Sequence, residues 1–403
     1  MTAQLQLSRD THVYASIADS TGERYYWKLP VLDGFSFSQS NATTEVTLSE
    51  MAGSNGTSSR RGRKLFTDAF EPAEWNLQLY GRPFNAQVNS SGDYIAGSTD
   101  EVLWSNFVNA GAYTAASADY ASGIDKDSHA LAATASKMTV DFDESNVVSL
   151  NTFDLFFVLG ACGTTPSSYL AGPGNAQTIY KVADAVCNSV SMDFDIDGIL
   201  TLDWSGLGTL ITEEANMPTA GSGSWHDYII SDGIAHSEGN FIRNRLTTLG
   251  VATTGSADPF GNTTSYDLTL TGGNISFENN LTFLTPEELC VVNQPIGNVT
   301  GTRNISGSFT CYLNAGTAGN NIGTSADLFD DLATGTGVVT NSANLTFSIG
   351  GGSSPKVVVK IPTAHLEIPT HSIEDVISLE VNFHALPGDL DETNEATLEY
   401  HNT

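Results

Sequence analysis

Apolar and polar residues alternate with a period of two through much of the chain. The alternation is clear in GFSFSQS from Gly34, EWNLQLY from Glu74, NISGSFTCYL from Asn304 and VISLEVNF from Val376. This period is typical of half-buried antiparallel strands, and dense Gly, Ser, Thr and Asn between such segments indicates turns. The pattern predicts a mainly β fold.

Four segments are expected to form short helices. They are GRKLFTDAF from Gly62, TDEVLWSNFV from Thr99, YKVADAV from Tyr180 and SADLFDDLA from Ser325. In the last of these, Ser325 is placed as the N-cap and Asp327 in the first turn, where a carboxylate is favourable. The prediction is therefore a β structure flanked by short helices.

A hairpin with an acidic face is predicted from VSMDFDIDGILTLDW, which begins at Val190. An odd-length loop centred on Gly198 would place Phe194 opposite Leu202 and collect the apolar side chains on one face. The other face would carry Asp193, Asp195, Thr201 and Asp203.

A second segment repeats this arrangement near the end of the chain. Ile377, Leu379 and Val381 would share one strand face, and Ser378 and Glu380 the other. A strand face of carboxylates and hydroxyls without a basic partner must contact water. It is either an ordinary outer surface or the wall of a water-filled channel.

The acidic hairpin also matches the opening of a calcium-binding loop, D-x-D-x-D-G, at Asp193, Asp195 and Asp197. Such a loop closes its oxygen cage with a bidentate Glu at position twelve, and this chain has Trp204 there. Alternating strand faces explain the carboxylates better than a metal. A calcium-dependent carbohydrate-binding β-sandwich is kept as an alternative.

Motifs for other chemistry are weak or missing. His365, Glu367 and His371 lie close in sequence, but Pro362 and Pro369 interrupt the segment and no further spaced ligand follows, which favours a solvated edge over a transition-metal site. The chain has no G-x-S-x-G, G-x-G-x-x-G or P-loop motif. We expect no enzyme activity, no catalytic residue, no metal and no cofactor.

Composition gives the chain a strongly negative charge. Forty-six acidic residues face 16 basic ones, a formal net charge of -30. Such a surface repels nucleic acid and anionic membranes. The longest apolar run, LFFVLGAC from Leu155, is too short to span a bilayer. We expect neither ordinary nucleic-acid binding nor a membrane partner.

One basic cluster stands against this background, in SSRRGRKLF from Ser58. It can be an ordinary solvated loop. In so acidic a protein, its charge also complements an acidic surface on a neighbouring copy of the chain. We favour a contact between subunits or rings for Arg60, Arg61, Arg63 and Lys64.

The two halves of the chain resemble each other in collinear order. The similar segments are YYWKLPVLDGFSF and SYDLTLTGGNISF, EVLWSNFVNAG and ADLFDDLATGT, FDLFFVLG and NLTFSIGG, and IDGILTLDW and IEDVISLEV. Amphipathic strands look alike in any β protein, but a shared order is unusual by chance. We therefore predict two copies of one fold, in residues 1–222 and 223–403, with an insertion at about 86–180 in the first and the spacer MPTAGSGS at the boundary.

These segments also carry a family resemblance. GFSFSQSNATTEVTLSE and RRGRKLFTDAFEPAEWNLQLYGRPF resemble the amino-terminal portion of tail tube proteins from tailed bacteriophages. GGNISFENNLTFLTPEEL, PIGNVTGTRNISGSFTCYL and LEIPTHSIEDVISLEVNFHALP resemble their carboxy-terminal portion. The motifs are strand and loop patterns without catalytic residues.

The resemblance implies two tandem tail-tube-type β-sandwiches or partial barrels with flanking helices. Long hairpins of neighbouring domains would join into a closed tube, and stacked rings would form the conduit for genome ejection. Tube rings of this family generally contain six domains, so two domains a chain would give a trimeric ring with pseudo-sixfold symmetry rather than a hexamer. The channel would be lined by Asp193, Asp195, Asp203 and Glu380.

The implied partners are other copies of the chain and other tail proteins, such as a sheath, terminator or baseplate. Double-stranded DNA would pass through the lumen without specific binding, since acidic walls do not hold phosphates. The expected location is the virion, after assembly in the host cytoplasm. A baseplate or injection-system tube component is a second alternative.

Overall fold

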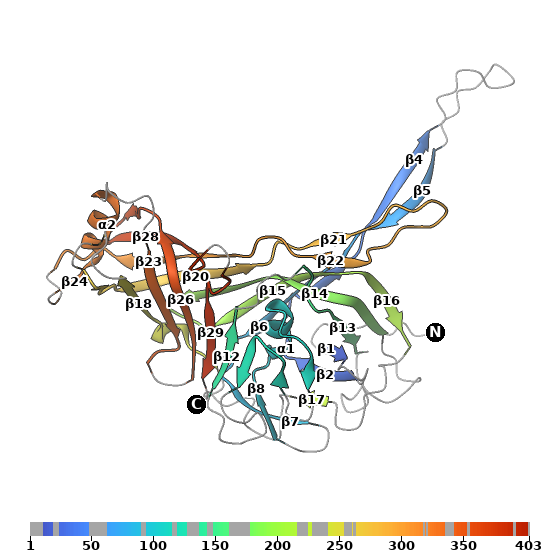
Figure 1. Cartoon of the computed structure of the whole chain (residues 1–403), viewed down its shortest axis with the longest axis horizontal. Coiled ribbons are helices and arrows are strands. Elements are labelled where there is room, and N and C mark those ends of the chain that lie inside the picture. The colour runs from blue at the N-terminus through green and yellow to red at the C-terminus, as the bar shows by residue number, and fades with distance from the viewer. Residues whose placement is uncertain are drawn as a thin grey trace.

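The computed structural model describes most of the chain. The described residues are 11–18, 24–47, 63–89, 94–114, 119–126, 137–142, 148–160, 178–215, 225–227, 241–253, 260, 263–316, 319, 321–334, 342–352, 355–389 and 392–401. They are mainly β, as the period-two pattern predicts (Figure 1). The boundary expected at residues 222 and 223, and its spacer from Met217, lie outside the described residues.

The first part of the chain contains strands and one short helix. Their bounds are β1 His12–Ala18, β2 Arg24–Leu29, β3 Ser36–Ser38, β4 Asn41–Thr47, β5 Arg63–Phe70, β6 Ala73–Tyr80, β7 Asn85–Asn89, β8 Tyr94–Gly97, α1 Glu101–Phe107, β9 Tyr113–Thr114, β10 Asp119–Tyr120, β11 Ile124–Lys126, β12 Lys137–Asp141, β13 Phe153–Leu159, β14 Thr178–Asp195, β15 Thr201–Gly208, β16 Leu210–Glu214 and β17 Trp225–Asp227.

The second part begins with a short 3₁₀ turn at Asn244–Leu246. Its elements are β18 Thr248–Thr253, β19 Ser265–Tyr266, β20 Leu270–Glu278, β21 Thr282–Leu284, β22 Gly297–Val299, β23 Asn304–Tyr312, β24 Ile322–Gly323, α2 Ser325–Thr334, β25 Ala343–Ile349, β26 Lys356–Leu366, β27 Thr370–Ile373, β28 Ile377–Ala385 and β29 Thr397–His401.

One antiparallel sheet runs through both parts of the chain, and we call it the main sheet. Its strand order is β3, β6, β15, β14, β20, β23, β28 and β27. The central pairing, between β14 and β20, joins strands from the two sequence halves. The alternating residues therefore build a continuous surface rather than separate sheets.

A second layer covers the apolar face of the main sheet. Strands β2, β1, β13 and the first half of β14 pair in order, and β18, β25, β26, β29, β12 and β11 form another run. Phe347 of β25 packs against Phe194, Phe309 and Phe383 of the main sheet, with ring centroids 5.7, 6.4 and 5.4 Å away. The core lies between these layers.

The strand pairings of the first part recur in the second. In the first part β2 pairs with β1, β1 with β13, β13 with β14, β14 with β15, β15 with β6, and β6 with β3. In the second part the corresponding pairings are β19 with β18, β18 with β25, β25 with β26, both β26 and β27 with β28, β28 with β23, and β23 with β20. Hairpin β4–β5 precedes β6 as hairpin β21–β22 precedes β23, and each helix lies before β13 or β25.

The two hairpins reach away from the core together. Backbone hydrogen bonds join them, since the N–H of Phe70 donates to the carbonyl of Asn293 and the N–H of Asn293 donates to that of Asp68. Figure 1 shows both projecting on the side of the molecule opposite α2. Leu65 and Phe66 on β5 and Leu289 on the other hairpin are exposed.

Two of the four expected helices are correct. The segments around Thr99 and Ser325 form α1 and α2. The segments from Gly62 and Tyr180 were wrongly assigned as helices, because they belong to β5 and β14. The N-cap of α2 is Thr324 rather than Ser325: its hydroxyl accepts from the N–H of Asp327, whose carboxylate accepts the Thr324 N–H at 2.7 Å.

The segment at 86–180, which the sequence predicts to be an insertion, also contains elements of the repeated fold. It includes α1 and β13, which have counterparts by position in the second part, as well as β7 to β12. Strand β12 pairs with the C-terminal strand β29, which also pairs with β26. Part of this segment therefore ties the first half of the chain to the second.

Candidate functional site

The face of the main sheet turned away from the core is polar along its whole width. Residues opposite one another form rows across the strands, because the pairing registers are continuous. One row is Gln78, Asp203, Ser191, Ser276, Ser306 and His384, and the next is Tyr80, Thr201, Asp193, Asn274, Ser308 and Asn382.

The opposite face of the same strands is apolar and buried. Met192, Trp204, Phe277, Phe309 and Val381 are all at most 1% exposed. The ring of Trp204 also lies 4.8 Å, centroid to centroid, from the ring of Trp104 on α1. This packing fixes the direction of each strand's pleat, so a slip of one residue would bury the polar row.

The four acidic residues predicted for a channel wall lie on this polar face. Asp193 and Asp195 are on β14, Asp203 on β15 and Glu380 on β28. Burial, followed by the negative charge of Asp203, raises the pKa of Asp193. The structure therefore brings the carboxylates of the predicted hairpin together, and places Glu380 on the same surface several strands away.

No lysine or arginine occurs in the described strands of the main sheet, apart from the first half of β14. Strands β3, β6, β15, β20, β23, β27 and β28 contain neither residue type, and β14 contains neither from Val186 to Asp195. These strands therefore give the face carboxylates but no lysine or arginine.

The hairpin prediction is correct for the two faces and wrong for the register. The observed pairs are Met192 with Leu202 and Asp193 with Thr201. The centre of the loop is therefore Asp197, one residue before Gly198, and Phe194 does not face Leu202. Gly198 adopts a φ of +118°, a conformation that glycine tolerates at little cost.

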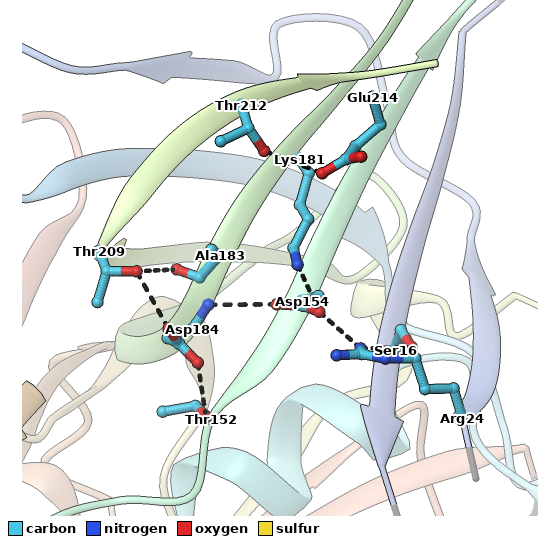
Figure 2. A network of polar contacts seen from close by, with 10 residues as sticks. All are labelled: Ser16, Arg24, Thr152, Asp154, Lys181, Ala183, Asp184, Thr209, Thr212 and Glu214. Atoms are coloured by element: carbon cyan, nitrogen blue, oxygen red, sulfur yellow. Dashed lines mark hydrogen bonds and ion pairs between the residues drawn. The ribbon is translucent and has the colours of Figure 1, made fainter. Parts of the chain in front are cut away.

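A polar network fixes the point where β14 enters the main sheet (Figure 2). The carboxylate of Asp154 lies 2.6 Å from Arg24 and 3.0 Å from Lys181, and accepts the backbone N–H of Asp184 at 3.3 Å. Asp184 has a φ of +47°, and its carboxylate accepts from the hydroxyl of Thr209 at 3.2 Å.

This network lies between the two pairing partners of β14. Up to Ala185 the strand pairs with β13 and β16, and from Val186 it pairs with β15, then also with β20. Because Asp154 binds both nearby cations, Lys181 and Arg24 are held at the second layer. The acidic half of β14 is left without a basic neighbour on its own strand.

The segment from His365 to His371 contributes the carboxylate of Glu367 to two polar contacts with β28. Nε2 of His384 lies 3.2 Å from Glu367, which also accepts from the side-chain amide of Asn382 at 2.9 Å. The hydrogen bond from Asn382, and then that from His384, lowers the pKa of Glu367. No cluster of three or more His, Cys, Asp or Glu suited to a metal occurs among the residues that the structure places.

The basic cluster is placed only in part. Arg60 and Arg61 lie outside the described residues. Arg63 and Lys64 are exposed on β5, where Arg63 lies 3.7 Å from Glu45 and the ammonium of Lys64 lies 6.0 Å from the ring centroid of Phe66. These two cations therefore stand on the projecting hairpin, away from the polar face.

Sequence reasoning missed most of the polar face. Its hydroxyl and amide side chains come from β6, β20 and β23, where Ser and Asn are too common in this chain to be distinctive. Their alternation with buried Trp, Leu, Ile and Phe is the signal that would have found them. The register that aligns them across strands is not contained in any one segment.

Taken together, the features define a mainly β protein whose prominent surfaces are a broad polar sheet face and two projecting hairpins. The chain is similar to the "Tail tube protein pb6" of Escherichia phage T5, with 27% identity over 400 residues, 98% of this chain and 75% of that protein. No family model matches the chain.

This homologue confirms the resemblance to phage tail tube proteins and supports a structural role in the tail tube. A phage tail tube protein is a component of the virion, which confirms the expected location. None of the helices in the described ranges is both long and apolar enough to cross a membrane.

Proposed function

We propose that three copies of this chain close into a ring, that the rings stack into a phage tail tube, and that the polar face of the main sheet lines its channel. The observation that carries this proposal is the main sheet itself. It runs through both halves of the chain with one buried apolar face and one acidic face, to which its described strands, counting β14 from Val186 onward, contribute no lysine or arginine.

The recurring strand pairings support two tube-forming units in one chain. Each unit contributes the same sequence of paired strands, a projecting hairpin and a helix to the fold. Six such units complete a ring when three chains associate, so the ring has threefold symmetry with a pseudo-sixfold arrangement of units. The boundary between units falls near residue 222.

The chemistry of the face suits the passage of DNA. Duplex DNA carries one negative charge per ~1.7 Å of its axis, and proteins that hold it do so by neutralising phosphates with Lys and Arg. Asp193, Asp195, Asp203 and Glu380 carry the same negative charge as the phosphates and therefore repel them. DNA is therefore kept hydrated and free to slide, with no fixed binding position.

The projecting hairpins supply a contact for stacking. Arg63 and Lys64 are exposed on β5 and, with Arg60 and Arg61 of the same cluster, complement the acidic surface that the chain's net charge of -30 predicts on a neighbouring ring. Where the tube ends, the same surfaces would meet other tail proteins, such as a terminator or baseplate, and a sheath would cover its exterior.

Electron microscopy of the purified chain tests the assembly. We expect hollow stacked rings whose class averages, viewed along the axis, contain three chains. Six chains in each ring would refute the two-unit proposal, and a chain that stays monomeric would refute the tube. A ring that never stacks would instead favour a baseplate or injection-system component.

Thiol labelling of the assembled tubes tests the orientation of the sheet. With the native Cys162 and Cys290 replaced by Ser, a small maleimide should label Asp203→Cys in tubes and in dissociated chains, whereas a maleimide carrying a bulky polymer should label only the dissociated chains. As a control, Lys64→Cys on the exposed projecting hairpin should react with the bulky reagent in dissociated chains, which shows that this reagent can label an exposed cysteine. Equal labelling of tubes and chains at position 203 by the bulky reagent would show that this face is not enclosed.

A further inference from the structure

The join between β14 and β20 shows how two units of this fold meet inside one chain. The strands pair antiparallel, with Ser191 opposite Ser276 and Asp193 opposite Asn274. Met192, on the opposite face of β14, lies opposite Ile275 and is completely buried. A closed ring needs the same kind of unit-to-unit contact between neighbouring chains, so this internal pairing shows what that contact should look like.

Strand β3 is the counterpart of β20 by sequence and by pairing. Ser36 and Phe37 match Ser276 and Phe277 in the repeated segments ending GFSF and NISF. Both strands pair with the strand that follows their projecting hairpin, β3 with β6 and β20 with β23. The position equivalent to Ser276 is therefore Ser36.

The segment that leads into β27 is the counterpart of the second half of β14. Asp203 pairs with Gln78, two residues along β6 from the partner of Ser36, and Asn382 pairs with Ser308, two residues along β23 from the partner of Ser276. These registers align Asn382 with Asp203, two residues further along than the repeated segments in the sequence suggest. The N–H of Glu367 donates to the carbonyl of Asn382 at 2.9 Å, and Ser191 lies opposite Asp203. The position equivalent to Ser191 is therefore Glu367.

These two counterparts are sheet edges. In the described part of the chain, β3 pairs with β6 alone and β27 with β28 alone. Ile368, next to Glu367, is 59% exposed and Ile373 is 79% exposed. An edge with exposed apolar side chains is a template for pairing with another strand.

We propose that the edge from Glu367 to Ile373 of one chain pairs antiparallel with the edge from Leu32 to Ser38 of the next chain, with Glu367 opposite Ser36 and, after a one-residue bulge at Pro369, Thr370 opposite Gly34. The same shift of one residue separates the contact of Glu367 with Asn382 from the pairing of Thr370 with Glu380. This proposal rests on the proposed ring and specifies how its chains join. The register is that of β14 with β20, transferred to the counterpart strands. Ile368 then contacts Phe35, as Met192 meets Ile275 inside the chain.

Engineered disulfides test the register. Antiparallel residues directly opposite have Cα atoms ~4.5–5.5 Å apart, within disulfide range, whereas a shift of two residues moves the partner roughly 6.8 Å along the strand and places the Cα atoms about 8.5 Å apart, beyond disulfide range. The test chain carries Glu367→Cys with Ser36→Cys. Its matched control carries Glu367→Cys with Ser38→Cys. Cys162 and Cys290 are replaced by Ser in both.

Mild oxidation of assembled full-length chains should link the Ser36 pair into covalent oligomers up to trimers. The yield of linked oligomers should be at least about tenfold above that of the Ser38 pair, which corresponds to a difference of ~1.4 kcal/mol or more in the free energy of bringing the two thiols together. Ser191→Cys with Ser276→Cys, which are opposite inside the chain, gives the yield expected for a correct register.

The outcomes separate this inference from the proposed function. If the unmodified chain forms rings and the Ser38 pair links better, or neither pair links, the register is wrong while the tube proposal stands. If the unmodified chain forms no ring, both fail. Assembly of each double variant under reducing conditions, checked by electron microscopy, shows that the substitutions leave the edges able to associate.

Discussion

Replacing Glu399 by Gln should loosen the C-terminal strand in a pH-dependent way. Oε1 of Glu399 lies 3.1 Å from the ammonium of Lys137 on β12 and 2.9 Å from that of Lys360 on β26, and Oε2 lies 3.2 Å from His401. The Glu399 side chain is only 10% exposed. This carboxylate therefore connects the strand to both of its sheet neighbours.

The pKa of Glu399 sets the size of the effect. Burial raises this pKa, but hydrogen bonds from Lys360, Lys137 and His401 outweigh burial and lower it to about 2. Lowering from the ordinary value of about 4.3 corresponds to at most about 3 kcal/mol of stability. Both lysines are partly exposed, so solvent screening reduces the expected loss to about 1–2 kcal/mol.

The sign follows from the lowered pKa in the folded chain. The contribution is complete above about pH 4.3, where the carboxylate is ionised in both states, and is lost as pH falls through about 2. The difference between Glu399→Gln and the unmodified chain should therefore be largest at neutral pH and less than half as large by about pH 3.

Hydrogen exchange of the unassembled chain measures the effect locally. At pH 7, amides of β29 and β12 should lose protection by about 5- to 30-fold in Glu399→Gln, as expected for a local opening that costs about 1–2 kcal/mol less. Glu380→Gln, which removes an exposed carboxylate on β28, serves as the control and should leave β29 unchanged. Unchanged protection of β29 in Glu399→Gln, or a loss of equal size at pH 3, would refute the reasoning.

Three further experiments, each based on substitutions, test packing and stacking. Phe347→Ala removes a ring that packs on three main-sheet phenylalanines and should destabilise the chain by about 3–5 kcal/mol, seen as a lower thermal midpoint; a midpoint within a degree of the unmodified chain would contradict the two-layer core. Gly307→Val should abolish soluble folded protein, because a Cβ there overlaps the carbonyl of Asn274 and the ring of Phe383, while Gly297→Ala, which meets nothing within 4 Å, should be tolerated. Arg63→Glu with Lys64→Glu should shorten tubes about tenfold in electron micrographs without changing single rings, and Lys356→Glu should not; tubes of normal length would exclude the basic cluster from stacking.

The sequence predicts the β class and the acidic hairpin because both depend on local alternation. Asp193, Asp195 and Asp203 alternate with buried Met192, Phe194 and Leu202 whatever the exact register, so the faces were predicted correctly even though the loop centre differs by one residue. The sequence predicts faces more securely than registers. Assigning a face needs only the alternation of side chains along one strand, whereas a register depends on the partner strand.

The wrong helix assignments have a different origin. Strand β5 is exposed for most of its length, so no face is kept apolar and its strand period is hidden. The first half of β14 pairs with β13 and β16 before the strand bends at Asp184, and its pattern changes there. Long-range pairings such as β14 with β20 and β12 with β29 leave no local signal at all.

The central claim is that the polar face of the main sheet encloses a channel shared by three chains. A cryo-electron microscopy reconstruction of the assembled tube tests it most directly, since the density resolves both the number of chains and the direction of the sheet. We predict three chains in each ring, with Asp193, Asp203 and Glu380 facing the lumen. Six chains in each ring, or a channel lined by other strands with these carboxylates on the outer surface, would contradict the account.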